Sequence, residues 1–317
     1  MKITKVGLDL GNSKTQLVID HDGKIVRASI PSRYAFARPP GEISAKTGQE
    51  LRAKAFSLTI DGRELWFGQD VLGGSTIQEI DMAKYDANHI AILFRAVLYQ
   101  ACKAAKINIA DLGRLDIVAS MPPGLFQDSG KNKVASAAFR KAFNRGQSHM
   151  WIRSGKTAAQ VVTKFVALQQ EAVSYGQSKR RPVGPYSLIV DLGGGTNDYA
   201  LFNGADNPLK TWTDNTGLLH VYKRINRDDA DQVELKILRD KTSLPPELLA
   251  FFNEVKRTIQ LITLKLPGSE IAELNIIGGG ASLMTAKVKA TFGPLAAKVF
   301  IHNEYANAEA SLKTAVK

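Results

Sequence analysis

Two clusters of acids and glycines have residue types and a spacing that could do chemistry. In the later cluster, Asp191 ends an apolar run, glycines follow at 193–195, and Thr196 and Asp198 come next. Backbone N–H groups in a glycine turn can approach an anion because no Cβ stands in the way. A carboxylate at the end of a buried strand can hold a metal-bound water or orient a nucleophile. A simple hairpin turn accounts for the glycines but does not require the acids around them.

The earlier cluster repeats this plan near the amino terminus. Asp9 ends an apolar run, Gly11 follows, and Asn12, Ser13 and Lys14 lead into the next apolar run. Positions 9 and 191 are 182 apart, so the plan occurs once in each half of the chain. Two similar anion-binding hairpins in matching context indicate two related halves that face one nucleotide.

Apolar patterning around the clusters predicts an α/β fold. Strands are expected over 3–10, 15–20, 24–30, 115–120, 150–153, 188–192, 199–202 and 271–277, with a hairpin over 55–67. Helices are expected over 89–106, 131–145, 157–175, 228–239, 245–266, 283–290 and 303–316, and one more opens at Gly217. Asn88 is the expected N-cap of the helix over 89–106, and His89 is expected on the surface.

Composition indicates a soluble globular protein of 317 residues, enough for two domains of ordinary size. Apolar residues make up 44% and charged residues 23% of the chain, which argues against disorder. The single cysteine, Cys102, excludes a disulfide framework. Because no apolar stretch is long enough to cross a membrane and no signal peptide precedes the first strand, we expect a cytoplasmic protein.

The net charge is strongly positive, at +12 with a pI near 9.6. This balance favours acidic partners such as a nucleotide, DNA or an acidic adaptor. Basic residues gather on the predicted helix over 131–145 and in a hydrophilic linker over 176–184. A solvated basic surface accounts equally well for the net charge, and it is the default interpretation of both segments.

Three stretches of the sequence resemble the nucleotide-binding motifs of the actin, sugar-kinase and heat-shock-chaperone ATPases. Residues 9–15 look like the first phosphate loop of that superfamily, 191–198 like the second, and 276–281 like the adenosine loop, in the family's order. Chain length and layout most resemble the ParM-type bacterial actins that segregate plasmids. The resemblance implies two related α/β domains, each with a mixed, five-stranded type of sheet flanked by helices, and a nucleotide in the cleft between them.

The same resemblance implies a division of the chain and a ligand. The first domain covers 1–175 and includes a small inserted subdomain at about 31–75, the second covers 176–302, and 303–317 is a terminal helix that returns to the first. The implied ligand is ATP or GTP with Mg²⁺. Asp9 and Asp191 hold the metal, most simply through water, and Asp191 also orients the hydrolytic water.

The resemblance also assigns the other site residues. Relatives carry a glutamine or glutamate at a strand–helix junction to position the attacking water, and the matching residue here is Ser154, with Gln160 further on. The superfamily's phosphate-neutralising lysine position holds Gln16, so Lys14 supplies the ammonium from a shifted place. The nucleotide-binding set is Gly11, Asn12, Ser13, Lys14, Gly193, Gly194, Gly195, Thr196, Gly217, Lys256, Gly278, Gly279 and Gly280.

The leading function expected from these residues is an ATPase that assembles head to tail into filaments, with DNA or a DNA-binding adaptor as a partner and no membrane. The alternative is a small-molecule kinase of the same superfamily, similar to pantothenate or sugar kinases. A chaperone-type ATPase and a non-hydrolysing DNA-binding module are further alternatives. ATP-dependent assembly would favour the filament-forming ATPase, and phosphorylation of a metabolite would favour the small-molecule kinase.

Overall fold

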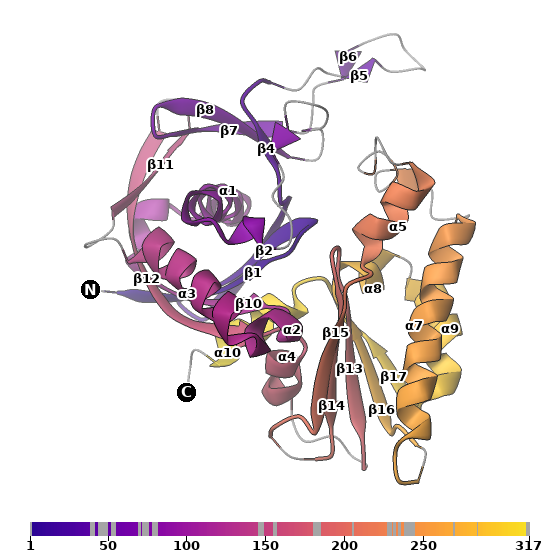
Figure 1. The fold of residues 1–317 in the computed structure, drawn as a ribbon. Coiled ribbons are helices and arrows are strands. Elements are labelled where there is room, and N and C mark those ends of the chain that lie inside the picture. The colour runs from indigo at the N-terminus through magenta and orange to yellow at the C-terminus, as the bar shows by residue number, and fades with distance from the viewer. Residues whose placement is uncertain are drawn as a thin grey trace.

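The computed structural model of the chain contains two large mixed sheets and the helices that cover them (Figure 1). It describes residues 2–314 apart from 39–41, 44–49, 52–54, 69–70, 72–75, 78–81, 145–148, 155–156, 180–184, 205, 227–229, 231–232, 234–235, 238–244, 269 and 284. The predicted helix over 228–239 and the end of the linker over 176–184 lie largely outside these residues. Among the described residues, no helix has both the length and the apolar character needed to cross a membrane.

The first sheet is built on three hairpin-connected strands, β1 (Ile3–Leu10), β2 (Lys14–His21) and β3 (Lys24–Pro31). β10 (Arg114–Met121) pairs in parallel with β1, and β12 (Thr157–Gln170) pairs in parallel with β10. The turn between β2 and β3 places Asp22 and Gly23 at φ 54° and 78°, the left-handed conformations that a two-residue hairpin turn requires. The strands predicted over 3–10, 15–20, 24–30 and 115–120 are confirmed.

Further strands extend the first sheet to ten, in the order β3-β2-β1-β10-β12-β11-β7-β8-β4-β9. The added strands are β11 (His149–Ser154), β7 (Ala55–Ile60), β8 (Arg63–Gly68), β4 (Tyr34–Ala35) and β9 (Thr76–Ile77), while β5 (Glu42–Ile43) pairs separately with β6 (Glu50–Leu51). This sheet curves around α1 (Ala87–Ala105) (Figure 1). The rings of Phe94, Phe139, Phe143 and Phe165 pack between α1, α3 (Ser129–Phe143) and β12.

The second sheet has five strands in the order β15-β14-β13-β16-β17. Their bounds are Ser187–Leu192 for β13, Asn197–Phe202 for β14, Lys210–Asp214 for β15, Glu273–Ile277 for β16 and Lys298–Ile301 for β17. One face is covered by α5 (Leu218–Ile225), α7 (Pro246–Leu264), α8 (Gly279–Leu283) and α9 (Thr285–Phe292) (Figure 1). Phe252 of α7 and Phe292 of α9 meet edge to face in the core under these helices.

The two sheets share one strand plan. In each, three antiparallel strands are followed by two parallel ones, so β3-β2-β1-β10-β12 matches β15-β14-β13-β16-β17. Such repetition confirms the internal duplication that the two acid–glycine clusters predict. The first sheet differs because a second set of strands extends it beyond β12.

Two helices lie between the sheets: α4 (Val173–Ser178), which follows β12, and α10 (Ala306–Thr314), which follows β17 (Figure 1). Ala308 of α10 packs against Val18 of β2, and Ala310 packs in a cluster with residues of α4, β13 and β14. Gly7 lets α10 approach β1 closely, because a Cβ at that position would lie 1.9 Å from the carbonyl oxygen of Ala308. The predicted terminal helix is therefore present, and it contacts both sheets.

The helix predicted over 157–175 is wrong. Residues 157–170 form the long strand β12, which pairs with β10 on one side and β11 on the other, and only 173–178 are helical. β-branched residues are frequent in this segment and favour a strand flanked by partners on both edges. A register shift between Ile117 and Val118 of β10 adds one residue to β12 and so disturbs the period of two that would have revealed the strand.

Two smaller expectations about α1 are also wrong. Its N-cap is Asp86 instead of Asn88, because the Asp86 carboxylate accepts from the backbone N–H groups of Asn88 and His89. His89 is 3% exposed and lies under Tyr34, with ring centroids 5.8 Å apart. Burial lowers the pKa of His89 to about 4, so its ring is neutral at physiological pH.

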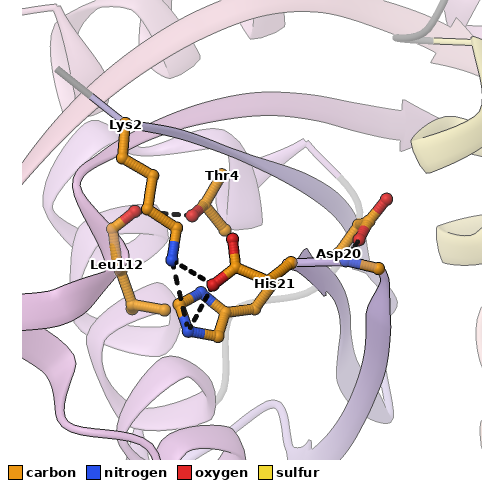
Figure 2. Close-up of polar contacts among 7 residues, drawn as sticks. Lys2, Thr4, Asp20, His21 and Leu112 are labelled. Atoms are coloured by element: carbon orange, nitrogen blue, oxygen red, sulfur yellow. Dashed lines mark hydrogen bonds and ion pairs between the residues drawn. The ribbon is translucent and has the colours of Figure 1, made fainter.

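The start of β1 is fixed by side chains at the end away from Asp9 (Figure 2). Lys2 Nζ donates to a carboxylate oxygen of Asp22 at 2.6 Å. Thr4 Oγ1 donates to the carbonyl oxygen of Leu112 at 2.5 Å. These contacts join β1 to the β2–β3 turn and to η2 (Ile109–Leu112), and they hold the register that places Asp9 at the carboxyl end of the strand.

Candidate functional site

The two glycine loops, residues 11–13 after β1 and 193–195 after β13, form the same turn. Gly11 N–H donates to the carbonyl oxygen of Lys14 at 3.0 Å, and Gly193 N–H donates to that of Thr196 at 3.0 Å. A Cβ at Gly11 or Gly193 would lie 2.7 or 2.6 Å from the same carbonyl oxygens. Both turns therefore require glycine at their first position.

An acid stands at the matching point of each hairpin. Asp9 is opposite Gln16 in the β1–β2 pair, and Asp191 is opposite Asp198 in the β13–β14 pair. The two hairpins thus carry three carboxylates and one amide at four equivalent places. Asp191 and Asp198 are 3% and 1% exposed, respectively.

The two loops face each other at close range. A Cβ at Gly194 would lie 2.9 Å from Cβ of Ser13, and one at Gly195 would lie 1.6 Å from Nδ2 of Asn12. The second loop is glycine-rich because the first loop occupies the space that side chains would need. As a result, residues from both halves of the chain converge on one small volume.

The amino end of α5 supports the second loop from behind. The N–H groups of Gly217, Leu218 and Leu219 donate to the carbonyl oxygens of Gly195, Gly193 and Gly194, at 3.0, 3.1 and 2.8 Å. A Cβ at Gly217 would lie 2.4 Å from the Gly194 oxygen. Gly217 therefore shapes the loop and is not itself among the residues that line the pocket.

The third glycine loop, residues 278–280 after β16, closes the same region. Gly278 has φ 86°, and a Cβ there would lie 2.1 Å from Oδ1 of Asp191. Gly280 packs against Leu192. Gly279 differs from both, because a Cβ at this position would meet no described atom within 4 Å. This position is open toward the pocket.

A pocket of about 690 Å³, part of it open to solvent, lies where the three loops meet. It is lined by both sheets and by residues from the segments between them. The lining residues are Asp9, Gly11, Asn12, Ser13, Lys14, Gln16, Lys84, Pro122, Glu171, Asp191, Gly193, Gly194, Gly195, Thr196, Leu218, Tyr222, Gly278, Gly279 and Asn307.

Four buried carboxylates gather at this pocket: Asp9, Glu171 and Asp191 line it, and Asp198 lies close to Glu171 and Asp191. Burial raises the pKa of Asp191 to about 8, and the charges of Asp198 and Asp9 add to the effect. Burial also raises the pKa of Asp198 to about 7. The pKa of Glu171 lies well above its usual value, again through burial first and then through the charge of Asp9. Like charges in a dry site disfavour ionisation of the whole group.

These carboxylates fit a divalent cation. Oxygen atoms of Glu171, Asp191 and Asp198 lie within 4.8 Å of one another, and carboxylate oxygens are the ligands that Mg²⁺ prefers. Asp198 is held in place by Thr213 Oγ1, which donates to one carboxylate oxygen at 2.5 Å, and by Thr196 Oγ1, which donates to the other at 2.9 Å. A cation here would also relieve the repulsion that raises the pKa values.

Two lysines bring positive charge to the pocket. Lys84 lies in the short helix η1 (Ala83–Tyr85), is 4% exposed, and opposes the rise in pKa of Asp9 and Asp198. Lys14 lines the pocket as expected, and its Nζ pairs with Glu304 at 2.8 Å. The sequence pattern gave no signal for Lys84, because no glycine or acid motif surrounds it.

Three of the sequence-predicted residues lie elsewhere. Ser154 ends β11 opposite Thr157, at the far end of β12 from the pocket. At about 3.3 Å per residue, the 14 residues of β12 separate that end from the pocket by roughly 40 Å along the strand. Gln160 is exposed on β12, and Lys256 is half-buried on α7. Among the residues that the structure describes, neither of these two lines the pocket.

Glu171 occupies the place that the resemblance assigned to Ser154. It directly follows β12 and precedes α4, so it stands at a strand–helix junction, as the water-positioning residue of relatives does. Its backbone N–H donates to the carbonyl oxygen of Met121 at 2.9 Å, which fixes the junction beside the end of β10. Because residues 157–175 were predicted to be helical, the strand–helix junction was expected near Ser154. It lies instead after residue 170, where β12 ends.

Comparison with known proteins agrees with this architecture. No protein-family model matches the chain, and no curated protein matches its sequence. Solved structures match it over its whole length. An archaeal actin homologue, Ta0583, gives a TM-score of 0.68 at 19% identity, covering 100% of this chain and 99% of that one.

Two ParM structures match in the same way. The ParM protein of pSK41 gives a TM-score of 0.61 at 16% identity, covering 99% of this chain and 97% of that one. Bacillus thuringiensis ParM, solved with ATP, gives 0.60 at 14% identity, covering 100% and 99%. At these identities the likeness establishes the fold: the chain has the two-domain, actin-like α/β fold seen in ParM.

Proposed function

We propose that this protein is an ATPase that binds ATP, or GTP, with Mg²⁺ in the pocket between the two sheets. The observation that carries the proposal is the convergence of both glycine loops on four buried carboxylates, with Glu171 at the strand–helix junction. Backbone N–H groups of the loops would hold the phosphates, and the open face at Gly279 would admit the base. Asp9, Glu171, Asp191 and Asp198 are the residues that would hold the metal, directly or through water. When bound, Mg²⁺ neutralises charge that develops on the phosphate oxygens.

Glu171 is the residue that would orient the attacking water and take up its proton. A buried carboxylate with a raised pKa is suited to accept a proton near neutral pH. Lys84 places a fixed positive charge beside the phosphate position, and Lys14 can exchange its ion pair with Glu304 for a phosphate oxygen. The close packing of the two loops against each other keeps these groups in position, so that catalysis comes from placement and charge.

We further propose that ATP binding drives head-to-tail assembly and that hydrolysis reverses it, as in a filament used to move or position DNA. ParM-like architecture supports this proposal, as does a pocket built from both halves, because domain closure then changes the outer surface. The exposed basic residues of α3, which include Lys133, Arg140 and Lys141, suit DNA or an acidic adaptor. The division into domains at 1–175 and 176–302, with 303–317 apart, and a cytoplasmic location form part of the same proposal.

Phosphate release and nucleotide binding, measured on matched variants, test the enzymatic proposal. Glu171→Gln keeps the shape of the side chain and removes the base, so turnover should fall by about 10²- to 10⁴-fold while a fluorescent ATP analogue still binds. Gln160→Ala, at an exposed position of the strand that precedes Glu171, should leave both unchanged. Equal turnover in Glu171→Gln and wild type would refute the role of Glu171.

Light scattering and pelleting with Mg-ATP test assembly. Scattering should rise on addition of ATP, decay as ATP is consumed, and persist in Glu171→Gln. A wild-type protein that stays monomeric and transfers phosphate to a metabolite would instead make it a small-molecule kinase.

A further inference from the structure

Helix α10 brings a single polar side chain, that of Asn307, to the floor of the pocket. Its neighbours on both sides are alanines, Ala306 and Ala308, which let the helix backbone pack tightly between the sheets. Asn307 is 3% exposed and lines the pocket. A polar side chain buried at a helix-packing interface needs hydrogen-bond partners that offset the free-energy cost of removing it from water.

Asn307 has partners from three segments. Its Nδ2 donates to Oδ2 of Asp191 at 2.5 Å and lies 3.5 Å from Oδ2 of Asp9. Its Oδ1 accepts from the backbone N–H of Ala172 at 3.2 Å. The amide therefore joins the end of β13 in the second sheet to the end of β1 in the first, and to the residue that follows Glu171.

An amide side chain can make all three of these hydrogen bonds. Its NH₂ group has two hydrogens for two carboxylates, and its oxygen accepts the Ala172 N–H. It is also neutral, so it adds no charge beside Asp9 and Asp191. An aspartate at position 307 would keep the oxygen but place a third carboxylate against the other two. A leucine would keep the approximate volume and lose every hydrogen bond.

Other contacts hold α10 in place independently of Asn307. Lys14 pairs with Glu304 at 2.8 Å just before the helix, and Arg27 of β3 pairs with Glu309 at 2.6 Å. The alanine contacts with both sheets add to these. Substitution of Asn307 therefore removes the tie between the carboxylates while α10 stays docked on the first sheet.

We propose that Asn307 is a positioning residue that ties Asp191 to Asp9 across the two sheets and so fixes the spacing of the two glycine loops. The effect on loop spacing is inferred from the hydrogen bonds of Asn307 alone. The effect on turnover rests on the proposed function, because the two loops can bind a polyphosphate together only when the distance between them is fixed. Without the tie, the second sheet separates from the first around α4 and α10, and the pocket opens.

A distance measurement on the nucleotide-free protein tests the tie. Spin labels at Ala137→Cys on α3 and Leu261→Cys on α7, both exposed positions, report the separation of the two halves in a Cys102→Ala background. We expect Asn307→Asp and Asn307→Leu to move the distance distribution to longer values and to broaden it. The matched control is Asn303→Asp, because Asn303 precedes the same helix, is exposed and uses its Oδ1 to accept from Tyr305 N–H. It should keep the wild-type distribution.

Enzyme kinetics provide a second test of the role of Asn307. Loss of a side chain that positions ligand-holding groups costs about 10- to 100-fold in activity, and we expect this loss in kcat for both Asn307 variants, with a smaller change in KM. Circular dichroism identifies any variant that fails to fold, and the remaining variant then decides. Wild-type distance distributions in folded Asn307 variants would overturn the proposal. If the wild type hydrolyses no nucleotide, the proposed function fails, and the distance arm alone still decides the role of Asn307.

Discussion

Replacement of Asp198 by asparagine should stabilise the nucleotide-free protein at alkaline pH. Asp198 is 1% exposed and is packed among Asp9, Glu171 and Asp191. Burial raises its pKa from 3.8 to about 7, although Thr213 and Thr196 donate hydrogen bonds that oppose the rise. Asparagine keeps the size of the side chain and an oxygen for a threonine hydroxyl, and it removes the charge.

The size and sign of the effect follow from this pKa. A rise from 3.8 to about 7 is about three units, and at 1.36 kcal/mol per unit it corresponds to roughly 4 kcal/mol. Between these two pH values the folded state holds a proton that the unfolded state has released, so the free energy of unfolding falls as pH rises. The cost is absent below pH 4 and complete above pH 7. Because the four acids repel one another, removal of one also eases ionisation of the other three.

Urea unfolding from pH 4.5 to pH 8.5, without nucleotide or metal, measures this effect. Wild type should lose stability through the range, while Asp198→Asn should lose less and exceed wild type by up to roughly 4 kcal/mol at the alkaline end. Asp61→Asn makes the same charge change at an exposed hairpin turn and should follow wild type. Parallel curves for Asp198→Asn and wild type would refute the repulsive cluster.

Two further predictions concern glycines. Gly279→Val should weaken nucleotide binding at least tenfold in a titration without lowering Tm, because the new Cβ meets no described atom and its methyl groups enter the pocket; wild-type affinity would assign this glycine to an ordinary turn. Gly7→Ala should lower the free energy of unfolding by about 1–3 kcal/mol in urea, because the added Cβ would lie 1.9 Å from the Ala308 oxygen and force α10 off β1. Gly293→Ala, where a Cβ meets nothing within 4 Å, is its control, and equal losses in the two variants would contradict the tight packing of α10.

The duplicated part of the fold could be predicted from sequence because its signals are local. Asp9 and Asp191 each end an apolar run and precede a glycine turn, and a hairpin joins neighbouring strands within a few residues. The same logic placed the glycines of 193–195, together with Gly278 and Gly279, at the pocket. Each of these features depends on residues that are close in sequence.

The missed residues depend on pairing between distant segments. β12 carries apolar residues at a spacing that fits a helix, and its strand conformation becomes favourable only between β10 and β11. Glu171 was missed with it, since its place is defined by the end of that strand. Lys84 and Asn307 belong to short helices without motifs, and only the packing of η1 and α10 brings them to the pocket. Sequence patterns identified the loops and gave no indication of the side chains that converge on them from elsewhere.

The position of α10 also sets the order in which the chain can be completed during synthesis. β1, β2 and β10 lie within the first 121 residues, yet the helix that covers Gly7 and Val18 ends at Thr314. β1 and β2 thus leave the ribosome long before their cover does, and at about 5–20 residues per second the interval is on the order of 10 s or more. The second sheet, whose strands run from Ser187 to Ile301 without interruption by the first, can form in that interval. The apolar face of β1 and β2 is consequently exposed in every new chain until α10 has been synthesised. Early chaperone binding and truncated products are therefore two practical concerns for producing this protein.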